Sequence, residues 1–173
     1  MSTPPAVDEA VERFSAMSDD TVRAALRACC ASSEWVDRVW AARPFRGRDQ
    51  LLDLAEAACR SLGPADVDEA LSGHPRIGDR PAGDSTEARW SRQEQQSVTD
   101  TDESTLDALV AANRAYQRRF GRVFLIRAAG RTAPEMLFEL RRRLCNDAAT
   151  EFGEVVEQLA QITRLRVERL LDS

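Results

Sequence analysis

The apolar residues of this chain recur with the spacing of an α-helix, and this periodicity constrains the fold more than any other feature. In the last and longest segment, 148–171, the apolar stripe contains Phe152, Val155, Leu159 and Ile162, which share one face at 3.6 residues per turn. Earlier helices are expected to begin near residues 7, 18, 32, 48, 65, 84, 102 and 132. The pattern predicts an all-α fold, a bundle of about eight helices.

One short apolar run does not fit a helix. Val123-Phe124-Leu125-Ile126 follows the helix-ending Gly121 and is too apolar for a surface loop, so we expect a buried extended connection whose main-chain amides could face a ligand. In the helix before it, Asn113 falls inside an apolar stripe. A buried amide there must find hydrogen-bond partners or cost stability.

Length and composition predict a globular protein. The chain has 173 residues, of which 43% are hydrophobic and 31% charged, so we expect one domain over residues 1–173 with its own core. A net charge of −5 disfavours nucleic acid as a partner, because phosphate binding needs a basic surface. The sequence shows neither a membrane-length apolar run nor a signal peptide, so we predict a cytoplasmic protein without membrane contact.

All 24 basic residues are arginines, which excludes Schiff-base chemistry on lysine and a lysine-dependent P-loop. The four cysteines are scattered, without the paired spacing of a zinc site. With a single histidine beside them, they predict no metal site and are interpreted as buried, reduced thiols. They are Cys29, Cys30, Cys59 and Cys145.

The single histidine, His74, lies in the stretch Gly73-His74-Pro75-Arg76-Ile77-Gly78 between two predicted helices. Imidazole has its unperturbed pKa near neutrality, which makes His74 a candidate for proton transfer. A lone histidine in a loop is, on position alone, more often a surface residue or a structural hydrogen-bond donor. Both interpretations stay open at this point.

Two further polar features accompany it. The next helix carries Ser91, Glu94 and Gln95, with Ser91 sharing one face with the other two; a solvated face is the plainer interpretation of such a helix. Arg166 continues the apolar stripe of the last helix. It is either an arginine reaching out from the edge of the core or a group that binds an anion in a pocket.

Together these residues resemble a known family, 2-oxo-4-hydroxy-4-carboxy-5-ureidoimidazoline (OHCU) decarboxylase. The similarity extends over nearly the whole chain, through five motifs in order. They are His74-Pro75-Arg76-Ile77-Gly78; Ser91-x-x-Glu94-Gln95; Asn113-x-x-Tyr116-x-x-Arg119-Phe120-Gly121 with Phe124; Arg143-Leu144-x-Asn146 with Glu151; and Ile162-x-x-Leu165-Arg166-Val167.

The resemblance implies an all-helical homodimer that needs no cofactor and converts OHCU to (S)-allantoin in urate degradation. It implies a catalytic role for His74 and a set of substrate-binding residues: Pro75, Ser91, Glu94, Gln95, Phe124, Leu125, Ile126 and Arg166. The chain departs from the family pattern at Gln96, Ser97, Arg122, Val123 and Arg127. These departures concern the packing around the extended segment more than the chemistry.

The implied chemistry suits the residues present. The carboxylate of OHCU is attached next to a ring C=N, so the electron pair released with carbon dioxide can flow into the imine, and the substrate supplies its own electron sink. The protein must add orientation, proton transfer and control of the face that is protonated. Two alternatives remain: a catalytically inactive helical module that binds a purine breakdown product, and a purely structural dimerisation domain.

Overall fold

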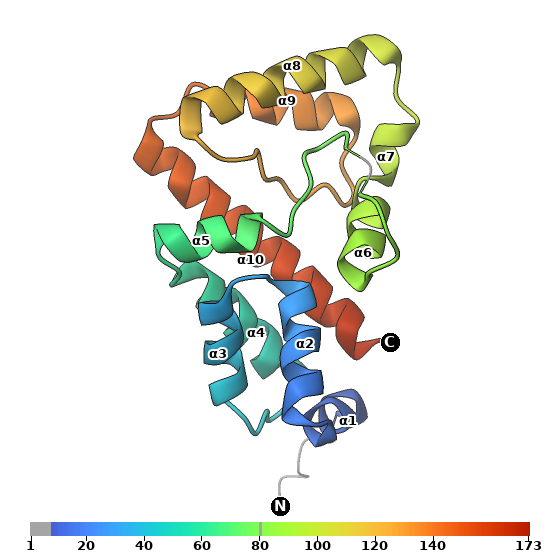
Figure 1. The fold of residues 1–173 in the computed structure, drawn as a ribbon, viewed down its shortest axis with the longest axis vertical. Helices are drawn as coiled ribbons and strands as arrows, with labels where there is room; N and C mark the ends of the chain where they lie inside the picture. Colours follow the sequence, from blue (N-terminus) through green and yellow to red (C-terminus); the bar gives the residue numbers. More distant parts are fainter. Residues whose placement is uncertain (1–7, 80) are drawn as a thin grey trace, which may run out of the picture.

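In the computed structural model, which describes residues 8–79 and 81–173, ten α-helices and no strands form the described chain (Figure 1). Their bounds are α1 Glu9–Ala16, α2 Asp19–Cys29, α3 Ser33–Ala41, α4 Arg48–Arg60, α5 Pro64–Leu71, α6 Thr86–Glu94, α7 Gln96–Thr99, α8 Glu103–Phe120, α9 Ala133–Arg143 and α10 Ala148–Leu171. The all-α prediction is confirmed. Nine of the ten correspond to the helix starts that the sequence indicates, the last at 148 included. The tenth, α7, is a single turn, too short to show apolar periodicity.

The helices begin where the sequence places capping residues. The side chains of Ser18, Ser32 and Ser85 each accept a hydrogen bond from a main-chain N–H of the first turn that follows, which satisfies a donor that the helix itself leaves free. Thr132 and Glu135 form the predicted capping box at the start of α9. Local sequence therefore fixes the helix boundaries.

Helix α10 runs through the middle of the molecule, with α8 and α9 side by side at one end and α2, α3 and α4 at the other (Figure 1). The buried apolar side chains form two clusters, of which the first includes residues of α10. The first joins α1 to α5 with the inward face of α10, including Trp35, Leu51 and Leu159, and the second joins α8 to α9 around Leu109 and Met136. Burial of these side chains against α10 and each other supplies the main stabilisation.

The connection between α8 and α9 is extended and buried, as predicted. Phe124 and Ile126 belong to the second cluster, whereas Leu125 belongs to the first, which is the alternation expected of an extended chain. Asn113 supports this region, because its side-chain amide donates to the main-chain carbonyls of Ile77, at 3.2 Å, and Leu109, at 3.0 Å. The extended segment thus runs along the seam between the two clusters.

A buried ion pair holds that segment in place. Arg143 and Glu151 have side chains only 1% and 2% exposed, and two guanidinium nitrogens of Arg143 donate to one Glu151 oxygen at 2.6 and 2.9 Å. The third, Nη1, donates to the Leu125 carbonyl at 2.7 Å. Tyr116 donates to the same carboxylate, and Asn146 donates to its other oxygen at 2.9 Å. Charges removed from water persist only with such partners.

Residues at which the chain departs from the family pattern find local partners. Arg122 makes a two-point ion pair with Asp68 of α5, at 2.9 and 3.3 Å. The main-chain N–H of Arg127 donates to Gln158 of α10 at 2.8 Å. These contacts attach the two ends of the extended segment to α5 and α10.

Three of the four cysteines are buried, as expected, but Cys145 is exposed. It lies just beyond the end of α9, where the chain turns towards α10 and leaves the core, so the prediction of burial is wrong for this residue. None of the described helices is both long enough and apolar enough to span a bilayer.

Replacing Arg143 with methionine should strongly destabilise the fold. The variant would leave the Glu151 carboxylate buried without its guanidinium, at a cost of about 3–5 kcal/mol in the free energy of unfolding measured with urea. Arg142→Met is the matched control, because the Arg142 side chain is 43% exposed and its ion pairs lie at the surface. Losing these pairs should lower the free energy of unfolding by under about 1 kcal/mol. Equal losses in the two variants would contradict this account of the buried network.

Candidate active site

A small cavity lies at the seam between the two apolar clusters. Its volume is about 20 Å³, which is room for roughly one water molecule. Eight of the nine predicted site residues line it, together with Ile77, Ala128 and Ile162. The eight are His74, Pro75, Ser91, Glu94, Gln95, Phe124, Leu125 and Ile126. The structure therefore brings together residues that are up to 52 positions apart in the sequence (74 to 126).

His74 enters the cavity from the loop that follows α5. Its main-chain N–H donates to the Leu71 carbonyl at 2.9 Å, which continues the last turn of the helix and fixes where the imidazole begins. Burial, helped by the positive charge of Arg166, lowers the pKa of His74 from 6.5 to about 3, since both disfavour the charged ring. The imidazole is therefore neutral at pH 7 and able to accept a proton.

Glu94 faces His74's cavity from the end of α6 and is held by Arg166 of α10. Arg166 donates from Nε and Nη2 to the two carboxylate oxygens at 3.1 and 3.0 Å, and Nη2 also donates to Ser91 Oγ at 3.1 Å. The Arg166 side chain is 2% exposed and that of Glu94 is 10% exposed. A two-point pair of this kind fixes both the position and the rotation of the carboxylate.

Arg166 is the predicted site residue that does not line the cavity. Its guanidinium contacts two residues that do line it, Ser91 and Glu94. Of the two interpretations open from the sequence, an arginine reaching out from the core edge is excluded by its 2% exposure. In this arrangement the carboxylate of Glu94 occupies the anion-binding edge of Arg166.

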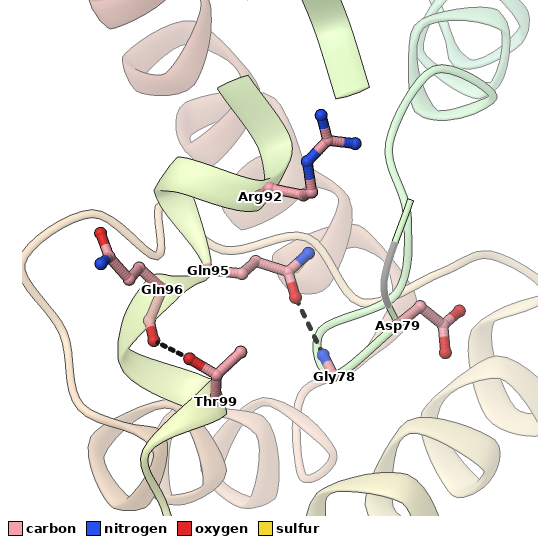
Figure 2. Close-up of a pocket in the computed structure, with 6 residues that line it drawn as sticks. All are labelled: Gly78, Asp79, Arg92, Gln95, Gln96 and Thr99. Atoms are coloured by element: carbon pink, nitrogen blue, oxygen red, sulfur yellow. Dashed lines mark hydrogen bonds between the residues drawn. The ribbon is translucent and has the colours of Figure 1, made fainter. Parts of the chain in front are cut away.

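Gln95 ties the histidine loop to the helix that carries Glu94. Its side-chain oxygen accepts from the main-chain N–H of Gly78 at 2.9 Å (Figure 2). Its side-chain nitrogen donates to the Arg76 carbonyl at 3.3 Å. Gly78 has a φ of 96°, a left-handed conformation that favours glycine. Gln95 therefore sets the loop's position relative to α6, in addition to forming part of the cavity wall.

Two wider pockets adjoin the cavity. One, of about 390 Å³, is lined by Gln95, Gly78, Asp79, Arg92, Gln96 and Thr99 (Figure 2). The other, of about 300 Å³, shares His74, Pro75 and Ser91 with the cavity and also includes Glu87. Gln95 lines both the cavity and the first of these pockets, and His74, Pro75 and Ser91 line both the cavity and the second.

Sequence reasoning gave no role to two residues that support the site. Arg143 donates to the Leu125 carbonyl and so positions the cavity wall. It belongs to one of the five family motifs, but the sequence does not show that this arginine is buried. Arg169 donates to Glu94 at 3.0 Å. The signal that could have found it is its spacing from Arg166, since residues three apart share a helix face.

The described residues offer no grouping of three or more His, Cys, Asp or Glu side chains that could hold a metal ion. The predicted independence from metals and cofactors remains a prediction. The site's own chemistry consists of a neutral imidazole, an arginine-backed carboxylate, a hydroxyl and an amide. This set can orient a small polar molecule and move a proton.

The fold and the cavity together define an all-helical protein with a small, partly polar cavity lined by four separate segments of the chain. The sequence pattern of the OHCU decarboxylase family matches residues 15–168, and the chain belongs to this family. The predicted family membership is thereby confirmed.

Individual relatives agree. The chain is 32% identical over 147 residues to the "Uric acid degradation bifunctional protein TTL" of Arabidopsis thaliana, covering 83% of this chain but only 45% of that protein's length. It is 28% identical over 135 residues to the "2-oxo-4-hydroxy-4-carboxy-5-ureidoimidazoline decarboxylase" of Amia calva, covering 77% of each.

Solved structures show the same fold. A crystal structure of OHCU decarboxylase in the presence of (S)-allantoin superposes with a TM-score of 0.73 at 30% identity, over 85% of this chain and 96% of that one. A crystal structure of (S)-allantoin synthase superposes with a TM-score of 0.66 over 94% of this chain and 53% of that one. At 17% identity the second match speaks for the fold alone.

The state of His74 is directly measurable, because the chain has a single histidine. Its imidazole nitrogens, observed by NMR, should show a neutral ring from pH 8 down to about pH 4, given a folded-state pKa of about 3. The unfolded chain, whose histidine titrates near 6.5, is the control. Because the unfolded state then binds more protons, this residue lowers stability as pH falls from about 6.5 towards 3. A folded-state midpoint near 6.5 would contradict the structure.

Proposed function

We propose that this chain decarboxylates OHCU to (S)-allantoin in urate degradation, without a cofactor. The observation that supports the proposal is the cavity itself, whose lining includes both His74, neutral at pH 7, and Glu94, which is paired with Arg166. The family membership and the names of the relatives support the choice of substrate. The carboxylated, ureide-bearing OHCU has groups that match each of these side chains.

In the proposed reaction the C–C bond to the carboxylate breaks, and carbon dioxide leaves. The electron pair moves into the adjacent ring C=N, the ring nitrogen takes up a proton from solvent, and a planar enol intermediate forms. The neutral imidazole of His74 accepts the proton of the 4-hydroxyl group as a carbonyl forms, and return of that proton to the ureido-bearing carbon completes allantoin, so one proton is taken up for each carbon dioxide released. The lowered pKa of His74 keeps the ring at pH 7 in the neutral form that can take a proton. It also weakens the imidazole as a base, since a proton-transfer group works best with a pKa near the operating pH.

Glu94 is proposed to accept hydrogen bonds from the N–H groups of the ureido arm and ring. An ionised carboxylate held by Arg166 can only accept, so it selects one orientation of the substrate and therefore one face for protonation. Arg166 would turn part of its planar fork towards the substrate carboxylate. Its Nη1 has no hydrogen bond to another described residue, whereas Nε and Nη2 do.

The extended segment is proposed to contact the ring through its main chain. The Leu125 carbonyl already accepts from Arg143, so this carbonyl is fixed in place before any ligand arrives. The remaining main-chain groups of Phe124 and Ile126, with Pro75 opposite, would complete the walls around a flat ring. A rigid wall of this kind lowers the cost of ordering the site when the substrate binds.

The direct test generates OHCU in situ from urate and follows the circular dichroism of (S)-allantoin. The protein should accelerate appearance of this signal over the spontaneous reaction, and His74→Asn should lower kcat by about 100-fold or more, as is usual for a positioned proton-transfer group. If wild-type protein bound allantoin yet left the time course unchanged, the alternative of an inactive binding module would replace this proposal.

We also propose that residues 1–173 act as one cytoplasmic domain and that the chain forms a homodimer; the family resemblance supports the dimer. Sedimentation at micromolar concentration should give a mass near twice 19.3 kDa. Full activity in a protein that sediments as a monomer would contradict the dimer proposal.

A further inference from the structure

Two arginines, not one, hold the carboxylate of Glu94. Besides the two-point contact from Arg166, Arg169 Nη1 donates to Glu94 Oε1 at 3.0 Å. Arg169 lies one turn further along α10, on the same face as Arg166. Its side chain is 23% exposed, against 2% for Arg166. Glu94 is therefore supported from the buried side by one guanidinium and from the solvent side by another.

One carboxylate facing two guanidinium groups leaves one positive charge in excess. Glu87, the acidic residue that lines the adjoining pocket, lies seven residues before Glu94 on α6. Among the described residues, Glu94 is the carboxylate that forms an ion pair with either arginine. The excess charge is available to a ligand.

The charge balance at Glu94 changes when the carboxylate of a ligand binds Arg166. With Arg166 alone, the ligand carboxylate and Glu94 would share a single positive charge in a poorly hydrated site, which is unfavourable for two like charges at close range. With Arg169 present, each carboxylate has its own guanidinium. Glu94 can then keep its position through Arg169 while Arg166 turns to the ligand.

We propose that Arg169 is a positioning residue: it keeps Glu94 paired while Arg166 binds the substrate carboxylate, and so makes the site favour the carboxylated substrate over its neutral product. The proposal rests on the function proposed above. It follows that the charge of Arg169 matters more for substrate than for (S)-allantoin, because the product no longer carries the carboxylate that competes for Arg166.

The kinetic test compares Arg169→Gln with Arg169→Lys. Arg169→Gln should raise KM for OHCU about tenfold, the scale of one lost charged hydrogen bond, while the inhibition constant of (S)-allantoin changes by less than about twofold. Arg169→Lys keeps the charge and should restore most of the affinity. Arg164→Gln is the matched control, because this arginine of α10 pairs with Asp53 and Glu56 away from the cavity, and it should leave both constants unchanged.

The proposal would be overturned if Arg169→Gln weakened the binding of substrate and product equally, or if it changed neither constant. A second measurement does not depend on turnover. The affinities for orotate and for uracil, which differ by one carboxylate, are measured by following the His74 imidazole resonance during titration with each ligand. Wild-type protein should prefer orotate, and Arg169→Gln should reduce that preference about tenfold. An unchanged preference, or none in the wild type, would contradict the role of Arg169. Absence of OHCU turnover would contradict the proposed function separately.

Discussion

The ion pair between Arg166 and Glu94 is the contact on which the geometry of the site depends. It joins the central helix α10 to α6, the helix that also carries Ser91, and it does so with side chains that are 2% and 10% exposed. Because a buried charge without its partner is costly, the two helices are held in one relative position. Gln95, the residue after Glu94, then transmits this position to the loop of His74 through Gly78.

The opposite end of α10 carries a second buried pair, Glu151 with Arg143, which fixes the other wall of the cavity. Arg143 reaches the Leu125 carbonyl at 2.7 Å, so the extended segment is held by charge as well as by packing on two apolar clusters. A single straight helix thus aligns two polar networks about four turns apart. The cavity lies where these networks and the seam between the clusters meet.

Much of this could be predicted from the sequence, because helices are encoded locally. Cap residues such as Ser18 and Thr132 and the apolar stripe of α10 specify where helices begin and which face is buried. The alternation of Phe124, Leu125 and Ile126 between two clusters was not predictable, since it depends on contacts distant in sequence. For the same reason the sequence could suggest Arg166 as a site residue but could not show that Glu94 and Ser91 are its hydrogen-bond partners.

The most direct test of this account is a crystal structure of the chain with (S)-allantoin bound. The ring should lie in a widened form of the cavity between His74 and Glu94, against the main chain of residues 124–126, with Arg166 and Arg169 both still within hydrogen-bond distance of Glu94 because the product has lost its carboxylate. Allantoin bound instead among Asp79, Arg92 and Thr99 in the pocket of about 390 Å³, with the cavity unchanged, would contradict it.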